Sequence, residues 1–169
     1  MNRVLVTLAS YLKTEMARSS KAEVVVHRDE AGEYSGFTLT LHVKPVPASR
    51  PRVTRWGTYY LKTYKAYKDA AHEAIPVCTE QTLTCELGAT VEFICHRPKS
   101  TKLVSPRGDI DNHLKAIFDA VVGVAATKKV KCKLKKYIKD DEIISHVDAR
   151  MRYAEPNEEP CTIITVGRL

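Results

Sequence analysis

The sequence has no long hydrophobic run, no closely spaced cysteine pair and no internal repeat. A membrane-spanning helix needs about 20 consecutive apolar residues, so we expect no membrane span. The short apolar start of the chain is followed at once by charged residues, which favours a cytoplasmic protein over a secreted one. The five cysteines are odd in number and form no Cys-x-x-Cys pair, which argues against a disulfide framework or a zinc site and predicts reduced thiols.

The composition is that of an ordinary globular protein with an excess of positive charge. The 169 residues suit one domain with a real core. Lys and Arg number 27 against 20 Asp and Glu, a net charge of +7. Such a surface attracts polyanions, which is compatible with nucleic-acid binding but does not require it.

Hydrophobic spacing predicts helices and strands that are intermixed along the chain. The predicted helices cover residues 3–17, 63–74 and 112–122, and the predicted strands cover 23–27, 37–43, 83–87, 89–96, 143–151 and 161–166. The proline-rich, basic segment 44–57 is predicted to be an extended loop. Because helices and strands do not alternate strictly, we predict an α+β fold, a single domain in which helices pack on a mixed β-sheet.

Two acidic clusters are the most informative feature of the chain. Asp109 and Asp111 stand just before a predicted helix, and Asp140-Asp141 stand just before a predicted strand. Carboxylates this dense repel one another unless a cation joins them. Mg²⁺ suits such a site because it takes oxygen ligands and keeps waters for a phosphate substrate. Lys115 lies one helical turn after Asp111, where an ammonium can neutralise charge that develops on a phosphate.

Structural roles for the same residues stay open at this point. Asp111 or Asn112 can cap the following helix, and an Asp-Asp pair is common in turns. Lys115 can form an ordinary surface ion pair, for which Asp119 is the expected partner.

Basic residues flank both acidic clusters and could contact the phosphates of a nucleic acid such as DNA. Phosphate contacts give affinity and salt dependence rather than recognition of a base sequence. The lysines between residues 128 and 139 have a strand-like spacing, so a solvated edge strand is the alternative. For Trp56 and Tyr59 we expect core or loop packing rather than stacking on an unpaired base. The predicted DNA-binding residues are Arg50, Arg52, Arg55, Lys99, Lys102, Arg107, Lys131, Lys133, Lys135 and Lys136.

These motifs resemble the RusA family of Holliday-junction resolvases. The family pattern Asp-x-Asp-Asn-x-x-Lys-x-x-x-Asp is present over residues 109–119, and Asp-Asp-x-x-Ile follows over 140–144. The segment Pro47-Ala48-Ser49-Arg50-Pro51-Arg52, followed by an aromatic stretch, is similar to another family feature. The sequence departs from the family in its N-terminal extension, in His113, for which a structural or supporting role is expected, and in the long lysine-rich segment between Asp119 and Asp141.

The resemblance implies a RusA-like nuclease domain over residues 37–169. From the spacing of their apolar residues, residues 1–36 are expected to be an extension, a helix plus a strand, packed on the core. It implies a metal site from Asp109, Asp111 and Asp141, with Asp140 assisting and Lys115 as the catalytic cation. Mg²⁺ is the implied cofactor and Mn²⁺ a plausible substitute. The implied protein is a homodimer, from a bacterium or a phage, that nicks two strands of a four-way DNA junction symmetrically.

Two other functions remain in view. One is a basic DNA-binding protein whose acidic motifs only cap and fix structure. The other is a less selective metal-dependent nuclease that cuts flaps or other branched DNA.

Overall fold

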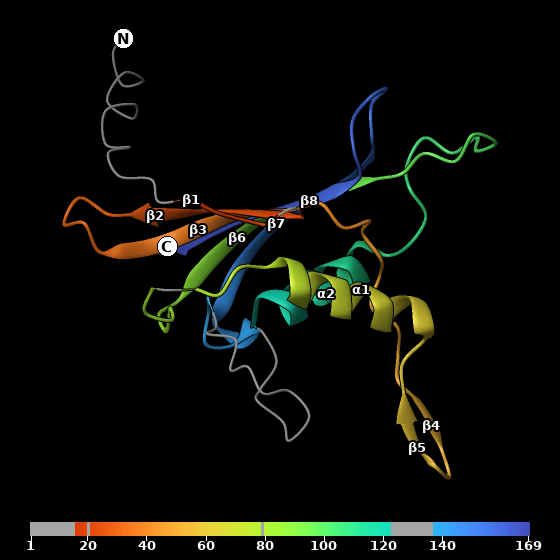
Figure 1. Ribbon diagram of the computed structural model, residues 1–169, viewed down its shortest axis with the longest axis horizontal. Coiled ribbons are helices and arrows are strands. Elements are labelled where there is room, and N and C mark those ends of the chain that lie inside the picture. The colour runs from red at the N-terminus through yellow and green to blue at the C-terminus, as the bar shows by residue number, and fades with distance from the viewer. Residues whose placement is uncertain (1–15, 20, 79, 123–136) are drawn as a thin grey trace.

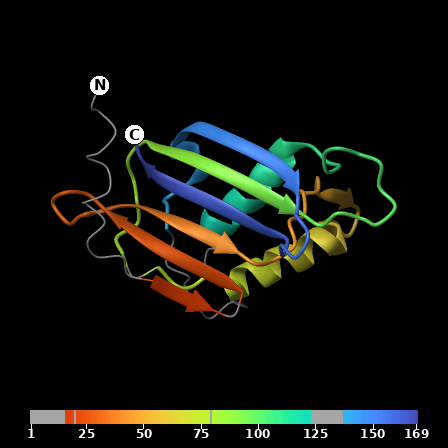
Figure 2. The same cartoon turned by 90° about the horizontal axis from the view of Figure 1, so that it is seen from above.

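A six-stranded β-sheet forms the centre of the protein. The computed structural model describes residues 16–19, 21–78, 80–122 and 137–169. The strand order is β1-β2-β3-β8-β6-β7 (Figure 2). Neighbours are antiparallel except β6 and β7, which are parallel, so the predicted mixed sheet is confirmed. The bounds are β1 Met16–Ser19, β2 Ala22–Arg28, β3 Tyr34–Leu41, β6 Leu87–Cys95, β7 Ile144–Tyr153 and β8 Cys161–Arg168.

Helices α1 (Lys62–Ala74) and α2 (Ile110–Val122) both lie on one side of this sheet (Figure 1). Each helix buries side chains at helical spacing, as the sequence pattern predicts. This two-layer arrangement confirms the predicted α+β class. Neither helix has the length and hydrophobicity that a bilayer crossing requires, within the described ranges. The buried side chains are Tyr64, Tyr67, Ala71 and Ala74 on α1, and His113, Ala116, Ile117, Ala120 and Val121 on α2.

The central strands alternate between the helix side and the opposite face. Phe37, Leu39 and Leu41 of β3 are fully buried in the core, whereas Thr38 and Thr40 between them are half-buried. This alternation confirms the strand predicted over residues 37–43. It follows from the two-residue period of a strand, which sends successive side chains to opposite faces.

Charged side chains on the face away from the helices are paired with one another. Glu92 of β6 accepts hydrogen bonds from Arg150 at 2.9 Å and from Arg152 Nε at 2.7 Å, across the parallel β6–β7 pair. The guanidinium of Arg152 also donates to both carboxylate oxygens of Glu158, at 2.6 and 2.7 Å. This network ties the loop that follows β7 to the sheet.

The N-terminal part of the sheet differs from the sequence prediction at one point. Met16–Ser19 forms strand β1 rather than the end of a helix over 3–17, and residues 3–15 lie outside the described residues. Pairing with β1 satisfies backbone groups of β2 that would otherwise be open. Strands β2 and β3 form an antiparallel hairpin, and in its turn the Asp29 carboxylate accepts from the Ala31 and Glu33 amides.

Two further segments correct the sequence prediction. Residues 83–86 form no strand, and Leu83 makes only an isolated bridge to Ile138; strand β6 begins at Leu87. Segment 44–57 is not wholly a loop, because β4 (Arg52–Thr54) pairs with β5 (Gly57–Tyr59) in a small hairpin. The remaining predicted helices and strands agree with the structure to within a few residues.

Candidate active site and nucleic-acid interface

The first acidic motif lies at the N-terminal end of α2. Asp109 precedes the helix and Asp111 lies in its first turn, and both side chains are exposed. The predicted cap at Asp111 or Asn112 is wrong, because both residues are already helical. Instead, the Asn112 amide donates to the Asp109 carboxylate at 3.4 Å. Gly108 before them has φ +113°, a conformation that glycine adopts without strain.

The buried side chain of His113 supports the backbone of the first acidic motif. Its ring is only 3% exposed and lies 5.3 Å from the Phe93 ring. Nδ1 is 3.2 Å from the Asp109 carbonyl oxygen, and because a carbonyl only accepts, Nδ1 carries the proton. Burial lowers the pKa of His113, although the bond to Asp109 opposes this. A side chain at Gly108 would meet the ring at 3.0 Å, so the predicted supporting role of His113 fits the structure.

Lys115 and Asp119 follow on α2. The Lys115 ammonium lies 3.9 Å from Asp119 and is largely exposed, which confirms the predicted ion pair. Asp119 is held more tightly from the other side, where the Tyr64 hydroxyl donates to it at 2.7 Å and Lys68 lies 3.8 Å away. Burial and this bond raise the pKa of Tyr64. Asp119 therefore joins α2 to α1, and the Lys115 ammonium stays largely accessible.

The second acidic motif lies on a short helical turn, η1 (Asp141–Ile143), which packs against α2 and leads into β7. A hydrogen bond with Asp140, followed by partial burial, raises the pKa of Asp141. The Lys115 ammonium acts in the opposite direction and lowers that pKa. Lys115 is thus electrostatically linked to Asp141, although the two residues are far apart in sequence.

The donor set suits a hard divalent cation. Asp109, Asp111, Asp140 and Asp141 are all exposed and offer only carboxylate oxygens, the ligands that Mg²⁺ prefers. The carboxylates of Asp140 and Asp141 repel each other, and a bound cation would relieve this repulsion. Among the described residues no three His, Cys, Asp or Glu side chains are gathered closely enough to form a metal cluster. Convergence of the two motifs on one ion therefore stays a prediction.

The proline-rich, basic segment 44–57, below called the arginine-rich segment, is hydrogen-bonded directly to α2. The Ala48 amide donates to the Asn112 carbonyl at 2.8 Å, which fixes the segment beside the first acidic motif. One residue further on, Ser49 Oγ accepts from the Leu61 amide at 3.3 Å and closes the base of the β4–β5 hairpin. The hairpin then projects away from the sheet and helices (Figure 1). Sequence reasoning did not predict either of these two bonds.

The hairpin presents an aromatic ring, Trp56, and one arginine, Arg55, at its tip. Trp56 is 83% exposed, so the expected packing of this residue is wrong. The Arg55 guanidinium lies 4.6 Å from the centre of its ring. Thr54 Oγ1 donates to the Gly57 carbonyl and accepts from the Trp56 amide, which holds the turn. Gly57 has φ +129°, which explains the glycine there.

The other predicted DNA-binding residues fall into two groups. Lys99, Lys102 and Arg107 are exposed on the loop between β6 and α2, together with Arg50 and Arg52 near the hairpin. Lys131, Lys133, Lys135 and Lys136 lie outside the described residues.

A charge pattern that sequence reasoning missed connects these regions. The chain has no acidic residue between Glu33 and Asp69, and none between Glu92 and Asp109. The first stretch contains the hairpin, and the second contains the loop before α2. Both stretches reach the N-terminal end of α2, so the first acidic motif is flanked by basic segments with no acids of their own.

Comparison with known families agrees with the motifs. The family described as Endodeoxyribonuclease RusA matches residues 42–166, a range that includes both acidic motifs and the arginine-rich segment. The protein belongs to the RusA endodeoxyribonuclease family. A search of curated proteins gives no match.

Proposed function

We propose that this protein is a Mg²⁺-dependent, structure-selective endodeoxyribonuclease that resolves four-way DNA junctions by paired, symmetric nicks during recombination and repair in the cytoplasm. The observation that carries the proposal is the family match over both acidic motifs. The packing of η1 against α2, which brings Asp141 close enough to Lys115 for the ammonium to lower its pKa, supports the proposal that both segments serve one site.

Asp109, Asp111 and Asp141 are the residues that would hold the ion, with Asp140 assisting, and Mn²⁺ is a plausible substitute. When bound, the ion would polarise the scissile phosphate and lower the pKa of a water. The Lys115 ammonium then neutralises negative charge on the phosphate oxygens as the P–O bond breaks. His113 and Gly108 keep the backbone of Asp109 in place, since the ring bonds to the Asp109 carbonyl and fills the space above the glycine.

The basic surfaces would hold the DNA. Arg50, Arg52 and Arg55 on one side, and Lys99, Lys102 and Arg107 on the other, can contact phosphates on both sides of the acidic motif. Lys131, Lys133, Lys135 and Lys136 stay predicted DNA-binding residues that lie outside the described part of the chain. Trp56 at the hairpin tip can stack on a base that has lost its partner at a branch point.

A homodimer follows from the substrate. A four-way junction has two-fold symmetry, and two copies of this chain related by a two-fold axis would place one active site on each cleaved strand.

Cleavage of a synthetic four-way junction, with and without Mg²⁺, tests this proposal. Paired nicks on opposite strands only with the ion would support it. Binding without cutting at any Mg²⁺ concentration would identify a DNA-binding protein instead. Equal cutting of flaps, single strands and junctions would identify a less selective nuclease.

A further inference from the structure

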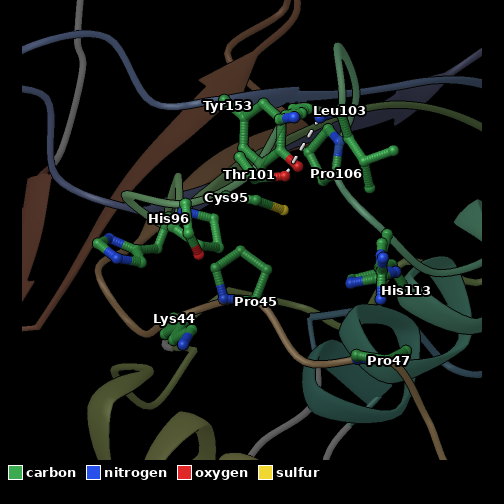
Figure 3. A pocket seen from close by; sticks show the side chains of 14 residues that line it. Lys44, Pro45, Pro47, Cys95, His96, Thr101, Leu103, Pro106, His113 and Tyr153 are labelled. Carbon is green, nitrogen blue, oxygen red and sulfur yellow. Dashed lines mark hydrogen bonds between the residues drawn. The ribbon is translucent and has the colours of Figure 1, made fainter.

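A cavity of about 530 Å³ lies beside the N-terminal end of α2 (Figure 3). Its walls come from the segment after β3, the end of β6, the loop before α2 and the end of β7. Figure 3 shows Pro45 and Pro47 on one side and Tyr153, Thr101 and Pro106 on the other. The volume is in the range of sites that bind small molecules, so one nucleotide unit can be accommodated.

The charged side chains that line the cavity are all basic. The rings of His96 and His113 line it together with three cations, Lys44, Lys102 and Arg107, and no described lining residue is acidic. Prolines and the Tyr153 ring supply flat apolar surface between these cations. Cations beside flat apolar walls match a nucleotide, which combines an anionic phosphate with a flat base.

The cavity adjoins the proposed catalytic residues. Arg107 is separated from Asp109 only by Gly108, and the His113 ring that forms one wall is hydrogen-bonded to the Asp109 carbonyl. A nucleotide in the cavity would therefore be a neighbour of the phosphate at the acidic motif. A base held in such a pocket has to leave the stack, and unstacking costs least where pairing is already interrupted.

We propose that this cavity is a subsite for one unpaired nucleotide next to the cleaved bond, with its base against Tyr153 and the prolines and its phosphate on Lys102 and Arg107. This inference rests on the proposed nuclease function and adds the place where a branch-point nucleotide is held.

The first test measures binding without catalysis. A 2′-deoxynucleoside 3′,5′-bisphosphate is titrated into the metal-free full chain, and affinity is followed by calorimetry. Because a charge-assisted hydrogen bond is worth roughly tenfold in affinity, Arg107→Ala and Lys102→Ala should each weaken binding about tenfold. Arg168→Ala is the control, since Arg168 pairs with Leu87 at the far end of β6 from Cys95. Equal affinity for the wild type and Arg107→Ala would overturn the proposal.

The second test fills the cavity. The Cys95 side chain lies inside it (Figure 3), so Cys95→Met should weaken bisphosphate binding, whereas Cys85→Met, at an exposed cysteine outside the cavity, should not. Circular dichroism checks the fold. Should Cys95→Met fail to fold, the Arg107→Ala titration decides.

A modified junction separates this proposal from the proposed function. An abasic nucleotide next to the cleaved bond should slow cutting by the wild type but have little further effect on Cys95→Met. If the wild type cuts both junctions equally, the subsite proposal is wrong, whereas the proposed nuclease function is unaffected. If it cuts neither the intact junction nor any other branched DNA, the nuclease proposal itself has failed.

Discussion

The arginines of β7 and those of the β4–β5 hairpin have opposite surroundings. Arg150 and Arg152 are matched by Glu92 and Glu158, and their charges are neutralised within the fold. Arg52 and Arg55 are exposed and form no ion pair with any described residue. The hairpin lies in a stretch without acids, whereas the sheet pairs its charges across strands. The comparison indicates that the sheet arginines stabilise the protein and the hairpin arginines are available to a polyanion.

The largest expected effect concerns the exposed carboxylates. Asp109→Asn or Asp141→Asn should lower Mg²⁺-dependent junction cleavage at least about a hundredfold, because a metal ligand supplies several kcal/mol of transition-state stabilisation. Junction binding should be retained in gel-shift experiments. Asp148→Asn, an exposed acid on β7, is the control and should cut normally. Normal cutting by both active-site variants would show that these carboxylates are only structural.

The next largest effect is expected at Lys115. Its ion pair with Asp119 has the same four-residue spacing as the Lys65–Asp69 pair, which serves as the comparison. Lys65–Asp69 on α1 is closed at 2.6 Å, whereas Lys115–Asp119 on α2 is loose at 3.9 Å. Lys115→Met should lower kcat by about a hundredfold with unchanged junction affinity, as when one stabilising donor is removed from an active site. Lys65→Met should leave kcat unchanged. Equal effects of the two substitutions on kcat would remove the catalytic role of Lys115.

Trp56 should matter for binding and not for stability. Base–aromatic stacking is worth about 1–3 kcal/mol, so Trp56→Ala should weaken junction affinity about tenfold, and Trp56→Phe should restore most of it. Because the ring is exposed, the melting temperature should not change. A lower melting temperature with unchanged affinity would instead assign Trp56 to packing.

Salt dependence separates the two sets of arginines. Each phosphate contact that is lost reduces the slope of log K against log salt by about 0.9. Arg52→Ala with Arg55→Ala should therefore lower the slope by about two such steps, whereas Arg150→Ala should leave it unchanged. Fluorescence anisotropy over a salt series measures both, and a reduced slope for Arg150→Ala would contradict the comparison.

The smallest effect is on stability. Arg152 donates to Glu158 and lowers the pKa of that carboxyl to about 2 from an ordinary 4.5. A depressed pKa adds stability above pH 4.5 that is lost as the pH falls towards 2. Glu158→Gln should lower the melting temperature slightly at pH 7, and the difference should shrink as the pH falls from 4.5 to 3. Glu159→Gln, its exposed neighbour, should show no such trend.

Much of the sheet and both helices were predictable because their patterns are local. The alternation of Phe37, Leu39 and Leu41 and the helical spacing around Ile117 record burial residue by residue. Strand β1 was not predictable, since its apolar residues also fit a helix and its pairing with β2 is a tertiary contact. The β4–β5 hairpin was hidden by the surrounding prolines and depends on the turn at Gly57.

The candidate site was predictable as motifs but not as a surface. The spacing of Asp109, Asp111 and Lys115 identifies the start of a helix, and Asp141 identifies the start of a strand. The sequence does not reveal that Ala48 is bonded to Asn112, or that η1 packs on α2. Such contacts join segments far apart in the chain and depend on the whole core being formed.

Junction cleavage by the wild type and by Asp109→Asn, each with and without Mg²⁺, tests the central claim most directly. We expect paired nicks on opposite strands only for the wild type in the presence of Mg²⁺, and intact but bound junctions in the other three reactions. Cleavage by Asp109→Asn at the wild-type rate, or wild-type cleavage in the absence of any divalent ion, would contradict it.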